Sequence, residues 1–324
     1  MKPQHDFEEE RLARLLGKLS AISTQAETLV SQMDELRREI RTLETQIDGV
    51  QPVFSTHYTI RPTSILVPIV AEGAKLPVYC VHPIEGGVVI YRELAKLLGR
   101  DRPFVAVQPV GIVGNERPLD SVAAMAERYR REIEQQQPAG PYNIMAWSMG
   151  GLIAFEMAQR WRASSEQVSL CLIDTAHPDF WREHFRTGKG VRDFIAGATE
   201  IFEFDDVQWA NERNVEEVFA AIDRHGRLKP GRQHLKRSWE VLKANNRAGI
   251  TYQTSSYSDR AVFIQASEPT FGRPEEYAQP WHDDIQSLVR YVAPGDHRSI
   301  LQGSNVAVVA EQIEPFLLNT PEES

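Results

Sequence analysis

The first fifty residues carry apolar side chains at spacings that alternate between three and four positions. These positions run from Leu12 to Ile47 without a break, and most residues between them are charged or polar. A stripe of this kind, sustained for about five heptads, predicts a coiled-coil helix over 1–50. Leu16 and Val30 widen the stripe, which suits a larger bundle or a different partner chain. A single amphipathic helix lying on a globular domain is the alternative.

After a proline-containing linker at 51–63, the pattern changes to short apolar runs separated by longer mixed segments. The runs are mostly apolar instead of alternating with polar residues, which predicts parallel strands buried on both faces of a sheet. We therefore expect an α/β domain over 64–324, with a mostly parallel central sheet flanked by helices. The predicted strands are 78–81, 142–146, 168–173, 262–265 and 288–292.

The longest interval between predicted strands, about 178–250, contains no run typical of a core strand. Its patterns are helical, which predicts a lid of helices inserted above the sheet. Its aromatic side chains suit either an acyl channel or a core: Phe180, Trp181, Phe194, Phe202 and Phe204. Six basic residues in the same interval favour either an acidic docking partner or an ordinary solvated loop: Arg224, Arg227, Lys229, Arg232, Lys236 and Arg237.

The run at 142–146 ends in a turn that carries a serine. The segment Ala146-Trp147-Ser148-Met149-Gly150 lies between this strand and an apolar stretch with helical spacing. A strand, a serine at a tight turn and a helix together form the context of a nucleophile elbow, whose usual pattern is G-x-S-x-G. Ser148 is therefore the candidate nucleophile, and Ala146 replaces the first glycine with one extra methyl group. The alternative is an ordinary strand–helix turn that contains a serine.

A serine hydroxyl needs a base to take its proton and an acid to orient that base. In α/β-hydrolases the chain order is serine, acid, histidine. Asp174 directly follows the strand at 168–173, where α/β sheets place functional groups, and Glu268 is the runner-up. His297 is the candidate base, because it lies late in the chain, after a strand, in a glycine-containing turn. The other histidines are expected to be structural.

A serine nucleophile also needs backbone N–H groups aimed at the oxyanion that forms on its substrate. The loop His82-Pro83-Ile84-Glu85-Gly86-Gly87 follows the strand at 78–81 and precedes a helix that starts near Tyr91. A loop in this place supplies one donor, and the residue after the nucleophile supplies the other. We expect the N–H groups of Ile84 and Met149 to form the oxyanion hole.

With these residues in place, the chain resembles the type I thioesterase domains of polyketide synthases, nonribosomal peptide synthetases and animal fatty acid synthase, in the α/β-hydrolase superfamily. The resemblance covers about 65–318, and its strongest segments are PVYCVHPIEGG (77–87), YRELAKLLG (91–99), AVQPVGI (106–112), GPYNIMAWSMGGLIAFEMA (140–158), LCLIDT (170–175) and PGDHRSIL (294–301). It implies a Ser148–Asp174–His297 triad below a helical lid. Glu85 departs from the glycine usual in peptide-synthetase members.

The resemblance also implies a substrate and partners. The substrate would be an acyl, polyketide or peptidyl thioester on the phosphopantetheine arm of a carrier protein, with no cofactor of the enzyme's own. Docking segments of synthase subunits are often helical, so the 12–47 coiled coil is expected to bind a synthase subunit or a second copy of the chain. Two other functions remain open: a stand-alone editing (type II) thioesterase, and a coiled-coil docking scaffold with an inactive hydrolase domain.

Charge and composition argue against several kinds of partner and site. A net charge of −9 argues against a nucleic-acid partner. Cys80 and Cys171 both lie in apolar runs, which predicts buried thiols instead of a disulfide or metal site. No signal peptide and no long apolar stretch is present, so we expect no membrane association and a cytoplasmic location.

Overall fold

The computed structural model describes residues 65–185, 231–268 and 278–319. The predicted coiled coil, the linker and the centre of the predicted lid lie outside these residues. The described part forms a seven-stranded sheet in the order β1-β3-β2-β4-β5-β6-β7. Its strands are β1 (Leu66–Val70), β2 (Val78–Val81), β3 (Phe104–Val107), β4 (Tyr142–Trp147), β5 (Val168–Ile173), β6 (Tyr257–Ala266) and β7 (Ile285–Ala293).

Every pair of neighbouring strands is parallel except β1 and β3, which are antiparallel. The predicted mostly parallel α/β sheet is therefore confirmed. The expected strands at 262–265 and 288–292 lie in the C-terminal parts of the longer strands β6 and β7. Two strands, β1 and β3, were not predicted. β1 is mostly half-buried and contains Pro68, and β3 is only four residues long.

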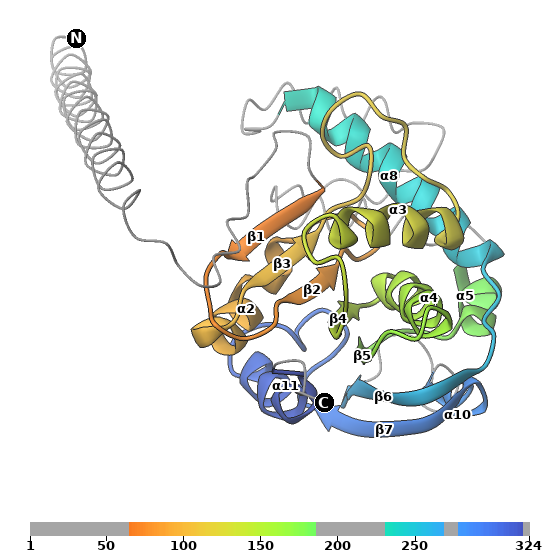
Figure 1. Cartoon of the computed structure of the whole chain (residues 1–324). Helices are drawn as coiled ribbons and strands as arrows, with labels where there is room; N and C mark the ends of the chain where they lie inside the picture. The colour runs from red at the N-terminus through yellow and green to blue at the C-terminus, as the bar shows by residue number, and fades with distance from the viewer. Residues whose placement is uncertain (1–64, 186–230, 269–277, 320–324) are drawn as a thin grey trace, which may run out of the picture. The chain divides into compact units, whose positions relative to one another are not determined.

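Helices cover both faces of the sheet (Figure 1). Apolar side chains of α3 and α4 fill the core on one face, together with residues from α5 and the C-terminal part of α8. Side chains of α2 and α11 fill the core on the other face. The helices are α2 (Arg92–Leu98), α3 (Val122–Glu134), α4 (Gly150–Ala163), α5 (Pro178–Phe185), α8 (Gly231–Thr251), α10 (Trp281–Asp284) and α11 (Asn305–Ile313), with short 3-10 turns at Val89–Tyr91, Gly99–Asp101 and Glu314–Phe316.

The strand β4 shows why the central strands are mostly apolar. Its residues Ile144 and Ala146 belong to the core below α3 and α4, whereas Met145 and Trp147 belong to the core below α2 and α11. Successive side chains of a strand point to opposite faces, so a sheet covered on both sides needs apolar residues at every position. All six residues of β4 are buried, including Asn143 at its start.

The strand order reverses direction between β2 and β4. From β2 the chain moves outward to β3, and β4 then pairs with the other side of β2. In open α/β sheets the loops at the carboxyl ends of strands diverge at such a point and leave room for a site. The loop after β2 and the serine turn after β4 meet here.

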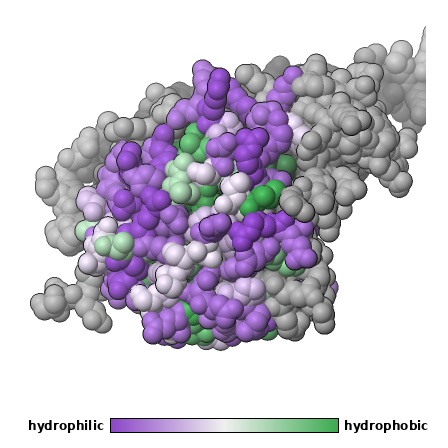
Figure 2. Space-filling view, turned by 90° about the vertical axis from the view of Figure 1, so that its right-hand side faces the viewer, coloured by the Kyte–Doolittle hydropathy of each residue, from purple (hydrophilic) through white to green (hydrophobic). Residues whose placement is uncertain are grey.

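The face on the side of α5 and α10 carries mostly hydrophilic residues, with a small group of apolar ones near its centre (Figure 2). None of the described helices is both long enough and apolar enough to span a membrane. Cys80 and Cys171 are free, buried thiols, and burial raises the pKa of both.

Candidate active site

The serine turn after β4 is a left-handed kink between strand and helix. Ser148 has a φ of 61°, and its N–H donates to the carbonyl of Ile173 on the neighbouring strand at 3.0 Å. A β-carbon added to Gly150 would lie 2.4 Å from the His82 carbonyl oxygen, and one added to Gly151 would lie 2.1 Å from Thr175 Oγ1. Both glycines are therefore required for the close approach of α4 to the loops around it.

The three predicted catalytic side chains form one hydrogen-bonded chain. His297 Nε2 lies 2.9 Å from Ser148 Oγ, and His297 Nδ1 lies 2.6 Å from Asp174 Oδ2. They are only 5% (Ser148), 3% (Asp174) and 8% (His297) exposed. The structure thus brings together residues that are 123 and 149 positions apart in the sequence.

Asp174 is held by hydrogen bonds at its backbone and at its carboxylate. Its backbone N–H donates to the Ile264 carbonyl at 2.7 Å, and its second oxygen, Oδ1, accepts from the Ala266 N–H at 2.9 Å. Like Ser148, it has a positive φ, of 43°. The alternative acid, Glu268, is exposed, and its backbone N–H donates to the Gly295 carbonyl. The carboxylate against His297 is therefore that of Asp174.

The turn that carries His297 is held by its own side chains. Asp296 Oδ1 accepts hydrogen bonds from the N–H groups of Arg298 and Ser299 and from the Ser299 hydroxyl. These hydrogen bonds, led by those of Ser299, hold the pKa of Asp296 below its usual value. On the other side, the ring of Trp147 lies against the imidazole, with 4.8 Å between ring centroids. The imidazole is thus packed as well as hydrogen-bonded.

The loop after β2, residues 82–87, is here called the oxyanion loop. It closes with a hydrogen bond from the Gly86 N–H to the Pro83 carbonyl at 3.0 Å. Gly86 has a φ of 81° and abuts Pro109, so a side chain would not fit there. Asn245 on α8, which is almost fully buried, donates from Nδ2 to the Ile84 carbonyl at 2.8 Å. Sequence reasoning missed Asn245, because it lies 161 residues from its partner and inside an ordinary helical pattern.

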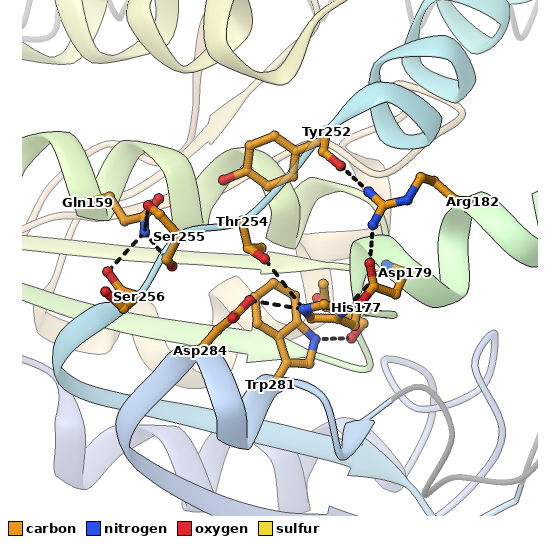
Figure 3. Close-up of polar contacts among 11 residues, drawn as sticks. Gln159, His177, Asp179, Arg182, Tyr252, Thr254, Ser255, Ser256, Trp281 and Asp284 are labelled. Atoms are coloured by element: carbon orange, nitrogen blue, oxygen red, sulfur yellow. Dashed lines mark hydrogen bonds and ion pairs between the residues drawn. The ribbon is translucent and has the colours of Figure 1, made fainter.

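The two ends of the predicted lid insertion are tied together beside the sheet (Figure 3). We call His177, Asp179, Arg182, Tyr252 and Asp284 the lid stem. His177 Nε2 lies 2.9 Å from Asp284 Oδ2 on α10, and its Nδ1 accepts from the Asp179 N–H at 3.2 Å. Arg182 on α5 contacts Asp179 and donates to the Tyr252 carbonyl, just after α8, at 2.6 Å. The start and the end of the insertion therefore have a fixed separation.

The structure describes only some of the residues predicted to act in the lid. Phe180 and Trp181 pack in the core on the α4 side, whereas Phe194, Phe202 and Phe204 lie outside the described residues. Of the basic group, Lys236 and Arg237 are half-buried on α8. Arg224, Arg227 and Lys229 lie outside the described residues, as does the side chain of Arg232. Within the described part of the chain, no group of three or more potential metal ligands is found.

The thioesterase domain family matches residues 76–317. The nonribosomal peptide synthetase ucdA of Aspergillus ustus is 25% identical over 94% of this chain and 36% of its own length. The inactive atromentin synthetase invA4 of Paxillus involutus is 35% identical over 52% of this chain and 18% of its own. This chain thus spans about a third or less of these two relatives.

A solved structure, the NocB thioesterase domain in covalent complex with a fluorophosphonate nocardicin G analog, superposes with a TM-score of 0.58 at 21% identity. The match covers 78% of this chain and 99% of that one. A likeness at this identity shows a shared fold. The family match covers most of the chain and includes the serine turn, the acid after β5 and the histidine turn. The chain therefore belongs to the thioesterase domain family and is similar in sequence to nonribosomal peptide synthetases.

Proposed function

We propose that this protein is a serine thioesterase that releases an acyl, polyketide or peptidyl chain from the phosphopantetheine arm of a carrier protein. The observation that carries this proposal is the continuous Ser148–His297–Asp174 hydrogen-bonded chain at a nucleophile elbow. Such a chain suits an ester, amide or thioester. The family match is what favours a thioester.

The first half-reaction transfers the acyl group to the enzyme. His297 Nε2 takes the proton of Ser148 as Oγ forms a bond to the thioester carbonyl carbon. Asp174 holds Nδ1–H and stabilises the imidazolium that results. The imidazolium then protonates the departing sulfur as the carbon–sulfur bond breaks. The products are an acyl-Ser148 ester and the free thiol of the carrier arm.

The tetrahedral intermediate carries a negative charge on the former carbonyl oxygen. The N–H groups of Ile84 and Met149 are the proposed donors to this oxyanion. Met149 is the N-cap of α4, and the first N–H groups of a helix lack intrahelical partners. Packing of Gly150 against the His82 carbonyl supports the proposal, because it brings the start of α4 against the oxyanion loop.

The second half-reaction releases the product. His297 takes a proton from water, or from a hydroxyl or amine of the bound chain, which attacks the acyl-Ser148 ester. Ser148 regains its proton from the imidazolium when the ester bond breaks. Water gives a free acid, and an internal nucleophile gives a ring. Hydrolysis and cyclisation use the same three side chains, and in both Ser148 returns to its starting protonation state.

The proposed partners follow from this substrate. A carrier protein must present the thioester, and residues 12–47, outside the described part, are proposed to bind a synthase subunit or a second copy of the chain. Acidic carrier proteins would be attracted by the basic residues of 224–237. Unchanged turnover of a carrier-bound substrate after charge reversal of these residues would contradict that docking role.

Covalent labelling tests the proposed function directly. A fluorophosphonate probe should label the wild-type chain, and mass spectrometry should place the label on Ser148. Ser148→Ala should remain unlabelled. If the wild-type chain resists the probe while correctly folded, the hydrolase is inactive and the docking-scaffold alternative is favoured. One relative is named as an inactive synthetase, which is why this experiment comes first.

The editing alternative differs from chain release in its preferred substrate. An editing thioesterase would hydrolyse short acyl groups that block many carrier proteins, whereas a release enzyme would prefer one mature chain. Mass spectrometry of the products from carrier-bound short acyl groups and from candidate mature chains distinguishes the two. Comparable hydrolysis of several short acyl carriers would favour editing.

A further inference from the structure

His82 begins the oxyanion loop, and its ring is completely buried. Its Nδ1 lies 2.9 Å from the Pro83 carbonyl oxygen, and its Nε2 lies 2.8 Å from the hydroxyl of Tyr129 on α3. A carbonyl oxygen only accepts hydrogen bonds, so Nδ1 must carry a proton. Nε2 of a neutral imidazole must then accept from the Tyr129 hydroxyl. The two contacts together select one tautomer of His82.

The protonation states of this pair suit that arrangement. Burial lowers the pKa of His82 to about 4, so the ring is neutral near pH 7. Burial also raises the pKa of Tyr129, so its hydroxyl keeps the proton that it donates to Nε2. Tyr129 thus supports His82 from α3.

The carbonyl that accepts from His82 belongs to the peptide unit whose N–H group is the proposed oxyanion donor. The Pro83 carbonyl and the Ile84 N–H are two ends of one peptide unit, which is trans. In a trans peptide the N–H points away from the carbonyl, so holding the carbonyl sets the direction of the N–H. The same carbonyl accepts from the Gly86 N–H at 3.0 Å. Hydrogen bonds to a carbonyl polarise the peptide, which makes its N–H a stronger donor.

We propose that His82, supported by Tyr129, is a positioning residue that orients and polarises the Pro83–Ile84 peptide for oxyanion stabilisation. This inference rests on the proposed function, in which the Ile84 N–H is an oxyanion donor. His82 does not touch the substrate and acts only through that peptide. Asn245 holds the next carbonyl from α8, so α3 and α8 each contribute a buried side chain that fixes the oxyanion loop.

A matched pair of variants separates this role from simple packing. In His82→Asn the amide nitrogen takes the place of Nδ1 and can still donate to the Pro83 carbonyl. In His82→Gln the longer side chain places its amide near Nε2 and leaves that carbonyl without its donor. The measurement is the second-order rate constant for fluorophosphonate labelling of Ser148, because the phosphoryl oxygen of the probe occupies the oxyanion position.

We expect His82→Asn to label within roughly threefold of the wild-type rate and His82→Gln to label roughly tenfold to a hundredfold more slowly. This loss is smaller than the 10²–10³-fold cost of removing an oxyanion donor itself, because the Ile84 N–H remains. Equal rates for the two variants would overturn the inference. Circular dichroism and thermal midpoints establish that the compared variants are folded.

Tyr129→Phe carries the test if either His82 variant fails to fold. It keeps the His82 ring and its Nδ1–H bond to the Pro83 carbonyl but removes the hydroxyl that holds Nε2, so the ring is held less firmly against that carbonyl. We expect labelling to slow roughly threefold to tenfold. Nitrogen-15 NMR of the imidazole should show Nδ1 protonated in the wild-type chain. A wild-type Nε2–H tautomer would refute the inference.

The labelling results separate the role of His82 from the proposed thioesterase function. A folded wild-type chain that is not labelled overturns both. Labelling of wild type at Ser148, with Ser148→Ala unlabelled but His82→Asn and His82→Gln equally reactive, leaves the proposed function intact and removes only the role of His82.

Discussion

The two ends of the sheet both hold buried polar groups, but they use them differently. At the carboxyl ends of the strands, Ser148 and Asp174 adopt positive φ angles and direct their side chains toward His297. At the amino ends, Arg102 and Asn143 hold backbone carbonyls in place. Left-handed backbone at a non-glycine residue costs stability. Two residues at the carboxyl ends of the strands therefore have strained backbones that direct their side chains toward His297. The polar residues at the amino ends stabilise the fold.

The amino-end network binds the C-terminal segment to the sheet. Arg102 Nη1 donates to the carbonyls of Leu76 and Leu318, and its Nη2 donates to Asn319 Oδ1. Asn143 both donates to the Leu318 carbonyl and accepts from the Leu318 N–H. Substitutions in the amino-end network should lower the free energy of unfolding without changing the reactivity of Ser148. Substitutions in the triad at the carboxyl end should lower turnover with little loss of stability.

The largest effect is expected from Ser148→Ala. Fluorophosphonate labelling should vanish, and turnover of an acyl thioester should fall by roughly 10⁴- to 10⁶-fold, because the nucleophile is lost. The free energy of unfolding should not fall, and Ser148→Gly should raise it by about 1 kcal/mol by relieving the positive φ. Urea denaturation measures this second effect. A clear loss of stability in Ser148→Gly would mean that the serine turn is not strained.

Asp174→Asn should reduce turnover by roughly 10⁴-fold, because an amide can hold His297 in the wrong tautomer. The hydrogen bond from the Ala266 N–H to Oδ1 can persist, so the fold should survive. Glu268→Gln is the matched control at the alternative acid, and it should stay within about twofold of the wild-type rate because Glu268 is exposed. The reverse ranking of these two variants would identify Glu268 as the acid.

Arg102→Met tests the amino end. The variant leaves three acceptors without their charged donor, so the free energy of unfolding should fall by roughly 3–5 kcal/mol. Labelling of Ser148 by the fluorophosphonate should remain at the wild-type rate below the unfolding transition. Arg92→Met, at an exposed arginine, should leave the denaturation midpoint unchanged. A slower labelling rate in folded Arg102→Met would show that the two ends of the sheet are coupled.

Acid should destabilise the protein through His82. Its folded-state pKa of about 4 lies below the unfolded value of 6.5, so the unfolded chain binds more protons between these values. The contribution of neutral His82 is fully present above about pH 6.5, and roughly 3 kcal/mol of it is lost as the pH falls to about 4. Urea denaturation across this range should show a smaller loss in His82→Asn. An identical loss in both proteins would contradict the depressed pKa.

The strands β2, β4, β5, β6 and β7 and the serine turn could be predicted because their signals are local. Continuous apolar runs mark strands buried on both faces, and Gly150 and Gly151 next to Ser148 mark a helix that touches its neighbours. Asp174 was a candidate because it directly follows such a run, and His297 because it lies late in the chain, after a strand, in a glycine-containing turn. The edge strand β1 carries no comparable signal, since one of its neighbours is missing and most of its residues are only half-buried.

The sequence by itself determined most of the strands and the residue types that can perform acyl transfer, because both depend on short-range patterns. Only the tertiary structure decided that Asp174 and not Glu268 meets His297, that His82 faces Tyr129, and that Asn245 reaches the Ile84 carbonyl. These contacts join residues 47 to 161 positions apart, where no periodicity relates the partners. Their geometry follows from how the helices pack on the sheet.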